Sequence, residues 1–204
     1  AAKLIKLDGQ KFEQFTITDG DTAEAARARI TKAAAGFLHV TDVVSKERKR
    51  RPSAPFTTST LQQEASRKLG FTTKRTMQVA QKLYEGVAIG EEGTVGLISY
   101  MRTDSVHLSV DALAEIRDVI ARDYGTASVP DKPVVYNTKS KNAQEAHEAV
   151  RPTSALRTPA QVARYLSDDE RKLYELIWKR AVASQMIPAT LNTVSVDLAA
   201  GSEH

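Results

Sequence analysis

Apolar and polar residues alternate at both ends of the chain, which is the pattern of β-strands. Residues 4–18 read LIKLDGQKFEQFTIT, and the Asp8-Gly9 pair within them favours a two-residue hairpin turn. Residues 193–198 read TVSVDL, in which every second residue is apolar, so we expect a half-buried strand there. The two ends therefore predict one β-rich piece built from both.

Between the two ends, apolar residues recur with the spacing of helices. Residues that cap helices precede these stretches, and a glycine closes four of them. The predicted helices begin at Asp21, Ser59, Thr73, Ser109, Thr158 and Ser167, and the closing glycines are Gly36, Gly70, Gly86 and Gly125. In the third helix we expect an inward stripe of Met77, Ala80, Leu83 and Tyr84.

Two of these helices are close neighbours in the sequence. Only Gly70-Phe71-Thr72 separates them, which predicts a helix-turn-helix. After the second helix, GEEG at 90–93 stands between the apolar stretches VAI and TVGLISY and predicts a hairpin. A helix-turn-helix followed by a hairpin is winged-helix-like, an arrangement that is common in DNA binding and also serves as a plain scaffold.

Together these elements predict an α+β fold in two parts. A mainly helical, winged-helix-like domain over residues 51–186 is inserted into a partial β domain formed by residues 1–50 and 187–204. The basic run KERKRRP (46–52) is predicted to link the two parts. Such a run is either a solvated connector or a contact for the phosphates of a nucleic acid.

Composition narrows the class of protein. The 204 residues include no cysteine and carry a net charge of +4, with a pI near 9.2, which weakly favours an anionic partner. Disulfides and thiolate metal sites are excluded, and no apolar run is long enough to span a bilayer, so we expect a cytoplasmic protein without membrane contact. The acidic trio Asp168, Asp169 and Glu170 is better explained by the first turn of a helix than by a metal ion.

One short stretch, LISYMRTDS at 97–105, has the residue types of a nucleophilic site. A free tyrosine has a pKa of about 10 and is a poor nucleophile unless its anion is stabilised. The guanidinium of Arg102 can stabilise the anion of Tyr100, and it can also donate two hydrogen bonds to a phosphodiester. On a regular strand, residues two apart leave by the same face. The pair predicts a phosphotyrosyl intermediate, although Tyr-x-Arg alone also describes a half-buried tyrosine beside a surface arginine.

A second stretch, AQEAHEAVRPT at 143–153, contains a histidine and an arginine four residues apart. On a helix, His147 and Arg151 would share one face, and Pro152 would end that turn. His147 is then either an ordinary exposed or capped histidine or a contact to a phosphate or base near Tyr100, with a charge that changes close to neutral pH.

In combination, these stretches resemble the type IA DNA topoisomerases, the bacterial topoisomerase I family. GLISYMRTDS (96–105) resembles the family's active-site tyrosine motif, and AQEAHEAVRPT resembles its later histidine motif. APFTTSTLQQEASRKLGF (54–71) and TMQVAQKLYEG (76–86) resemble the helical segment that precedes the tyrosine motif. The resemblance covers most of the chain. The sequence departs from the family pattern at Ser99, where threonine is usual, and at Val106 and His107, where small polar residues are usual.

The resemblance implies a transient break in single-stranded DNA. Tyr100 would attack the phosphodiester, keep the 5′ end as a phosphotyrosine and release a 3′-hydroxyl, while Arg102 stabilises the phosphoryl charge. The supporting or DNA-binding residues would be Ser99 and Thr103, Asp104 as an orienting group, and His147 and Arg151 as contacts to the DNA backbone.

The resemblance also implies an enzyme larger than this chain. It needs no ATP, because the phosphotyrosine conserves the bond energy, and the chain has no P-loop motif. Its Mg²⁺ is bound by a Toprim domain, so we expect the metal ligands outside this chain and no relaxation of supercoils by the chain alone. Residues 1–50 and 187–204 would be part of the gate domain, residues 51–186 would carry the tyrosine, and the enzyme would act on the nucleoid of the bacterial cytoplasm.

Other classes of protein fit less well. A tyrosine recombinase requires H-x-x-R, whereas His147 and Arg151 have a different spacing, and a relaxase requires paired metal-binding histidines, whereas the four here are scattered. The main alternative is a noncatalytic winged-helix DNA-binding module, in which Tyr100→Phe would leave function intact. A structural, subunit-contact role would be favoured if the chain had no salt-sensitive affinity for single strands.

Overall fold

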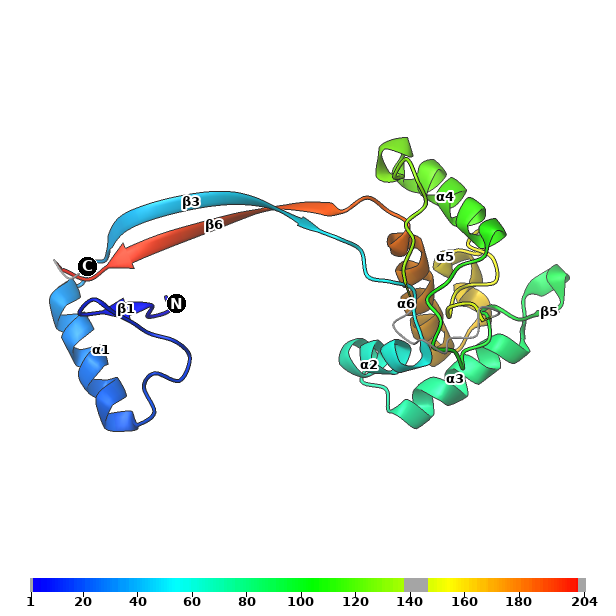
Figure 1. The fold of residues 1–204 in the computed structure, drawn as a ribbon. Helices are drawn as coiled ribbons and strands as arrows, with labels where there is room; N and C mark the ends of the chain where they lie inside the picture. Colours follow the sequence, from blue (N-terminus) through cyan, green and yellow to red (C-terminus); the bar gives the residue numbers. More distant parts are fainter. Residues whose placement is uncertain (1, 138–146, 202–204) are drawn as a thin grey trace. The chain divides into compact units, whose positions relative to one another are not determined.

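The computed structural model describes residues 2–137 and 147–201 (Figure 1). It contains helices and strands, so the prediction of a mixed fold is confirmed. The chain divides into two compact units. The first comprises Ala1–Lys49 and Thr190–His204, and the second comprises Arg50–Ala189, so the second unit interrupts the first in sequence.

The first unit begins with the predicted hairpin. Strands β1 (Lys6–Leu7) and β2 (Gln10–Lys11) pair antiparallel. Asp8 and Gly9 connect them with φ angles of 51° and 78°. A turn of type I′ requires positive φ at both central residues, and aspartate followed by glycine tolerates this well, so the turn prediction is confirmed.

Helix α1 (Gly20–Ala34) is capped by Asp19 rather than by the predicted Asp21. The Asp19 carboxylate accepts a hydrogen bond from the Thr22 backbone N–H at 2.8 Å. Asp21 lies inside the first turn, where a carboxylate also interacts favourably with the helix dipole. This double preference of aspartate for a cap and for the first turn explains the error in the predicted start.

Strands β3 (His39–Arg50) and β6 (Ala189–Ala199) form a two-stranded ribbon, and they run in opposite directions in Figure 1. The basic run 46–52 contains the boundary between the two units, between Lys49 and Arg50, so it connects them as predicted, and its residues 46–50 belong to strand β3. Long basic side chains are compatible with an exposed strand, since the backbone pairs in the ribbon while the charges reach into solvent.

The apolar side chains of β6 are exposed. The strand predicted at 193–198 is confirmed, but its predicted half-burial is wrong for Val194, Val196 and Leu198. Among the described residues of the first unit, only Ala26 is buried. A two-stranded ribbon offers no second layer that could cover one of its faces.

The second unit contains the predicted helices that follow α1 in the chain. They are α2 (Thr58–Leu69), α3 (Thr73–Glu85), α4 (Val110–Tyr124), α5 (Pro159–Val162) and α6 (Asp168–Ser184). The predicted hairpin is present as β4 (Val87–Ala88) and β5 (Thr94–Val95), joined through a 3₁₀ turn at Gly90–Glu92. Further 3₁₀ turns lie at Thr126–Ser128 and Ala163–Tyr165.

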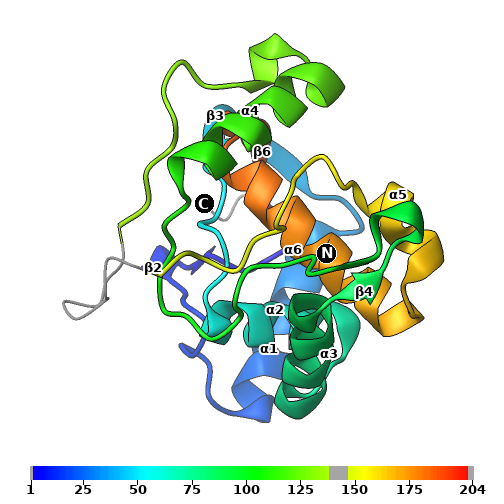
Figure 2. The same ribbon diagram turned by 90° about the vertical axis from the view of Figure 1, so that its right-hand side faces the viewer.

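Helix α6 lies at the centre of the core of the second unit. Figure 2 shows it in the middle of the helices, and it packs against α2, α3, α4 and α5. The Tyr174 hydroxyl donates a hydrogen bond to the Arg157 carbonyl at 2.6 Å, and the Trp178 indole donates one to the Ala155 carbonyl at 2.9 Å. Burial raises the pKa of Tyr174, so this phenol stays neutral. The buried residues of α6 are Leu173, Tyr174, Ile177, Trp178, Ala181, Val182 and Ser184.

Helices α2 and α3 differ from prediction in two details. The capping box of α2 is formed by Thr57 and Thr60, two residues before the predicted box that began at Ser59. In α3 the predicted inward position of Tyr84 is wrong, because its side chain is 40% exposed. The buried stripe of α3 contains Leu83, and the next residue lies about 100° further around the helix.

Candidate active site

Tyr100 lies on a segment without regular secondary structure. The predicted strand before it is reduced to an isolated antiparallel bridge between Ile98 and Pro152. Ile98 and Met101 are buried on either side, whereas Tyr100 is 45% exposed. The tyrosine is therefore fixed by its neighbours and open to a reaction partner.

The end of α3 holds the segment that leads to Tyr100. The Leu97 N–H donates to the Leu83 carbonyl at 2.7 Å, and the Thr153 hydroxyl donates to the Gly96 carbonyl at 2.7 Å. A Cβ atom at Gly96 would lie 2.6 Å from the Tyr84 carbonyl oxygen, so only glycine allows this approach.

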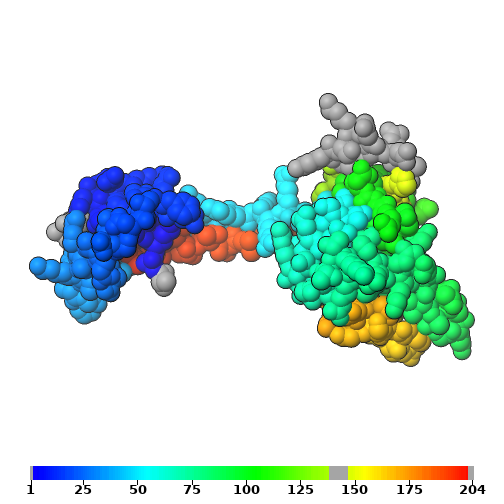
Figure 3. Space-filling model, turned by 90° about the horizontal axis from the view of Figure 1, so that it is seen from below, coloured from blue at the N-terminus to red at the C-terminus, as the bar shows by residue number. Residues whose placement is uncertain are grey.

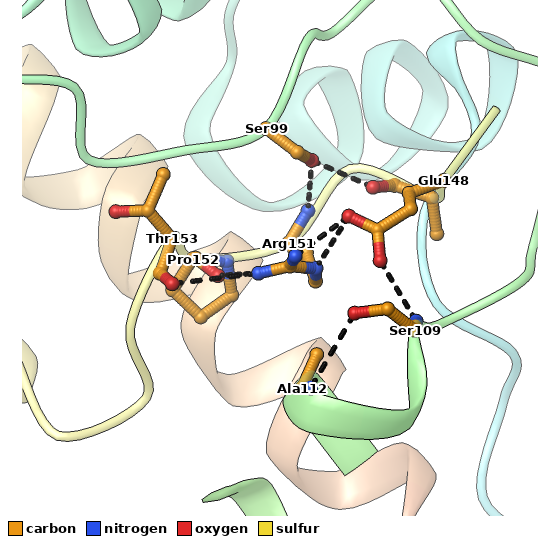
Figure 4. A network of polar contacts seen from close by, with 8 residues as sticks. Ser99, Ser109, Ala112, Glu148, Arg151, Pro152 and Thr153 are labelled. Carbon is orange, nitrogen blue, oxygen red and sulfur yellow. Dashed lines mark hydrogen bonds and ion pairs between the residues drawn. The ribbon is translucent and has the colours of Figure 1, made fainter. Parts of the chain in front are cut away.

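Ser99 joins the tyrosine segment to residues 147–153 (Figure 4). Its hydroxyl donates to the Ala149 carbonyl at 2.6 Å and accepts from the Arg151 N–H at 3.0 Å. Its own N–H donates to the Arg151 carbonyl at 2.9 Å. Ser99 thus uses both its backbone and its hydroxyl to position the residue before Tyr100.

The prediction that His147 and Arg151 share a helical face is wrong. Residues 147–151 are not helical, and Val150 forms an isolated antiparallel bridge with Phe56. The N–H of Ala149 donates to the carbonyl of His107 rather than to a residue one turn earlier. Pairing with distant segments therefore replaces the helical hydrogen bonds. Residues 143–146 of the quoted motif lie outside the described residues.

Arg151 is bonded within the protein. Its Nε and Nη2 donate to Glu148 at 3.0 and 2.6 Å, and its Nη1 donates to the Pro152 carbonyl at 2.9 Å. The other Glu148 oxygen accepts the Ser109 N–H at 2.7 Å, at the start of α4 (Figure 4). Burial opposes ionisation of Glu148, but the hydrogen bonds from Ser109 and Arg151 outweigh it and lower the pKa of that carboxyl.

A cleft of about 470 Å³ brings four of the predicted site residues together. We call it the Arg102 cleft. Tyr100, Ser99 and Arg151 are not among its lining residues. It is lined by Thr57, Thr58, Ser59, Arg102, Thr103, Asp104 and His147.

The N-terminus of α2 forms one wall of the Arg102 cleft. The Thr58 hydroxyl accepts the Thr103 N–H at 2.8 Å and donates to the Met101 carbonyl at 2.7 Å. The Thr58 N–H donates to the Thr103 carbonyl at 2.9 Å. These bonds fix the residues on both sides of Arg102 against the partially positive end of a helix. A guanidinium, an imidazole, hydroxyls and a helix N-terminus together suit a phosphate group.

Sequence reasoning missed Thr57 and Thr58 as parts of this site. The available signal was their position at the start of α2, where hydroxyl side chains also serve as ordinary caps. The tertiary contact with Thr103, 45 residues away, distinguishes Thr58 from such a cap.

The three acidic residues at the start of α6 form ion pairs or hydrogen bonds within α6 and its cap or with α3. Asp168 pairs with Arg171 and Lys172, and Asp169 pairs with Arg75. Glu170 completes the capping box of Ser167. Within residues 2–137 and 147–201 no three histidine or acidic side chains are grouped so that they could hold a metal ion. The helices described there include none long and apolar enough to cross a membrane.

Tyr100 is exposed two residues before Arg102, which lines a cleft suited to a phosphate group, and comparison with known proteins gives the family. The chain belongs to the bacterial DNA topoisomerase family, because a family model described as DNA topoisomerase matches residues 2–204. The resemblance to the type IA enzymes read from the motifs is thereby confirmed.

Individual relatives sharpen the assignment. The chain is 79% identical over 204 residues to DNA topoisomerase 1 of Xylella fastidiosa (strain 9a5c), covering 100% of this chain and 25% of the relative. It is 51% identical over 198 residues to DNA topoisomerase 1 of Rickettsia bellii, covering 97% of this chain and 24% of the relative. The full-length topoisomerase I structure from Thermotoga maritima matches with a TM-score of 0.70 and 38% identity, covering 92% of this chain and 29% of that one. The chain spans about a quarter of the length of these curated relatives.

Proposed function

We propose that this chain supplies the nucleophile of a type IA DNA topoisomerase that relaxes negatively supercoiled DNA. The phenolic oxygen of Tyr100 attacks a phosphorus atom of single-stranded DNA, and the bond from phosphorus to the 3′ oxygen breaks. The phenol loses its proton, the leaving 3′ oxygen gains one, and the 5′ end stays on Tyr100 as a phosphodiester. The reverse attack by the 3′-hydroxyl reseals the strand, so no ATP is consumed.

The observation that carries this proposal is the exposure of Tyr100 on a segment anchored at both sides, two residues before the guanidinium of the Arg102 cleft. Arg102 would donate to the non-bridging phosphate oxygens as charge develops there. His147 and Thr103 would contact the DNA backbone from the same cleft, and Asp104 would orient the neighbouring side chains.

Ser99 and Arg151 act mainly through structure in this proposal. Ser99 bonds the 147–153 segment, and the Arg151 guanidinium is held by Glu148 and the Pro152 carbonyl. A contact between Arg151 and the DNA backbone would need to share or replace these hydrogen bonds, so we assign Arg151 a supporting role.

The Mg²⁺ implied by the family does not fit this cleft. Asp104 is the one acidic residue among the residues that line it, and the fixed positive charge of Arg102 in the same cleft repels a cation. We therefore place the metal ligands in the Toprim domain of the parent enzyme and route no step through the metal here.

The finer architecture is proposed on the same basis. Helices α2 and α3 with the β4–β5 hairpin would form a winged-helix-like scaffold within a tyrosine-bearing domain at 51–186. Residues 1–50 and 187–204 would belong to a partial gate domain. The enzyme would act on single-stranded DNA at the nucleoid, in the bacterial cytoplasm.

The test is covalent trapping in the full-length parent enzyme. Wild-type enzyme incubated with a single-stranded oligonucleotide should give a covalent DNA–protein adduct. Mass mapping should place this adduct on the peptide that contains Tyr100. Tyr100→Phe should abolish the adduct, while Tyr84→Phe, which alters the adjacent phenol, should retain it.

Two results would contradict the proposal. An adduct on another residue would show that Tyr100 is not the nucleophile. Intact DNA binding with no adduct from the wild-type enzyme would favour the noncatalytic winged-helix module. The isolated 204-residue chain should not relax supercoiled DNA when Mg²⁺ is supplied.

A further inference from the structure

The outward face of α3 carries polar residues at regular helical spacing. Lys74, Gln78 and Lys82 are four residues apart and exposed, so they lie along one side of the helix. Burial of Val79 and Leu83 against the core fixes that side outward. Figure 3 shows residues of α2 and α3, coloured cyan to green, at the surface of the second unit.

A second cleft, of about 920 Å³, follows this face of the helix. We call it the α3 groove. Arg102 lines both the α3 groove and the Arg102 cleft, so the two hollows share this residue. The groove is lined by Lys74, Arg75, Met77, Gln78, Val79, Gln81, Lys82, Arg102 and Asp169.

The charge of the α3 groove is positive after its internal pairing is considered. Arg75 donates to both Asp169 oxygens at 2.7 Å and lies over the Phe71 ring, so this arginine and the one acidic lining residue neutralise each other. Lys74 and Lys82 form no ion pair within residues 2–137 and 147–201. Two lysines and Arg102 are therefore left facing the groove.

We propose that the α3 groove holds the phosphate backbone of the single strand on one side of the cleavage position. This rests on the proposed function and adds the path of the strand: past Arg102 and along α3 to Lys74. The two lysines are eight residues apart, roughly 12 Å along the helix axis, which spans more than one phosphate. The Gln78 side chain carries amide donors and an acceptor, so it can hydrogen-bond to the phosphates or the bases of the strand.

The salt dependence of binding tests the groove. In the full-length parent with Tyr100→Phe, which prevents cleavage, single-strand affinity would be measured by titration at several salt concentrations. Each of Lys74→Ala and Lys82→Ala should reduce the slope of log K against log salt by about 0.7, the value for one phosphate contact of a single strand. Lys132→Ala removes the same charge from an exposed position that lines neither hollow and should leave the slope unchanged.

The outcomes separate this inference from the proposed function. Unchanged slopes in both groove variants would overturn the groove assignment, as would an equal loss in Lys132→Ala. The adduct on Tyr100 is measured separately in the cleavage-competent enzyme. If the wild type forms it while the groove variants bind normally, only the path of the strand is wrong.

An independent observation concerns the ring beside the nucleophile. The rings of Tyr84 and Tyr100 meet edge to face, with centroids 5.2 Å apart and an interplanar angle of 61°. Tyr84 itself is held in place, because its carbonyl lies against Gly96 and the neighbouring Leu83 carbonyl accepts the Leu97 N–H. The structure assigns Tyr84 as a positioning residue that restricts the directions the Tyr100 ring can take.

Single-turnover cleavage by the full-length enzyme tests this role. Tyr84→Ala should slow adduct formation about three- to tenfold, because an aromatic pair contributes only modestly beyond its burial. Tyr84→Phe keeps the ring and should restore the rate. Oligonucleotide affinity should stay at the wild-type value in both variants.

A merely structural contact would behave differently. Equal slowing in Tyr84→Phe and Tyr84→Ala would show that the hydroxyl, not the ring, matters and would overturn the assignment. A wild-type rate in Tyr84→Ala would also overturn it.

Discussion

The two units of the chain bury their apolar residues very differently. The second unit packs a continuous core around α6, whereas the described residues of the first unit bury only Ala26 and expose Phe15, Phe37 and the apolar side chains of the β3–β6 ribbon. Similar amphipathic patterns in the sequence thus lead to a packed core in one region and to exposed faces in the other. Tyr100 and its anchoring contacts lie in the packed unit, which suits the defined geometry that the proposed nucleophile requires.

Matched leucine substitutions should give the largest difference between the two units. Leu173→Ala in α6 removes a fully buried side chain and should reduce the free energy of unfolding by about 2–5 kcal/mol. Leu191→Ala in β6 changes a side chain that is 46% exposed and should alter it by less than about 0.5 kcal/mol. Urea unfolding of the chain measures both, followed by Trp178 fluorescence for the second unit and by far-UV circular dichroism for the first, and similar losses would contradict the contrast in burial.

Matched glycine substitutions should give a smaller difference. At Gly96 a Cβ would collide with the Tyr84 carbonyl, so Gly96→Ala should destabilise the second unit by about 1–3 kcal/mol and slow Tyr100 chemistry. At Gly20, in the first turn of α1, a Cβ meets nothing within 4 Å, so Gly20→Ala should stay within about 0.5 kcal/mol of wild type. Thermal unfolding measures the stability of both glycine variants. Adduct formation in the full-length parent enzyme measures the effect on Tyr100. A neutral Gly96→Ala would show that the segment can move aside.

Matched carboxylate substitutions should give the smallest difference. Glu148→Gln weakens the partly buried contacts to Arg151 and Ser109 and should reduce the free energy of unfolding by about 1–2 kcal/mol at neutral pH. Glu24→Gln removes an exposed ion pair with Arg27 in the first unit and should have no measurable effect.

The pH dependence of the Glu148 effect has a defined sign. The folded protein lowers the pKa of this carboxyl below its ordinary value of 4.5, so its contribution is complete above 4.5 and is lost as the pH falls through the folded pKa. The difference between wild type and Glu148→Gln should therefore shrink as the solution is acidified below 4.5. A difference that grows on acidification would contradict the assigned direction.

Local sequence patterns were reliable for elements and less so for their ends. The Asp8-Gly9 turn, the long helix after Ser167 and the hairpin after α3 are all found. The caps of α1 and α2 were misplaced by two residues, because several neighbouring side chains could have accepted the same backbone hydrogen bond. The basic run at 46–52 connects the two units as predicted, but the strand over its residues 46–50 was missed because that strand pairs with a segment far along the chain.

The candidate site was predictable in its residue types and not in its arrangement. Tyr100 and Arg102 could be proposed from their chemistry and from the family motif. The wall formed by Thr57 and Thr58 could not, and neither could the engagement of Arg151 by Glu148. The helical reading of 147–151 failed because spacing alone cannot exclude an extended segment that pairs with two other parts of the chain.

Apart from residues 147–151, the amino-acid sequence was enough to predict the helices, the hairpins and the residues with reactive groups, because these depend on hydrogen bonds and side-chain chemistry within a few residues. The folded structure was needed to show that Arg102 and His147 share a cleft and that the rings of Tyr84 and Tyr100 meet. Those relations join segments that are distant in the chain, and the packing around α6 brings them together. Burial of apolar surface drives that packing, and it acts on the whole unit rather than on any one motif.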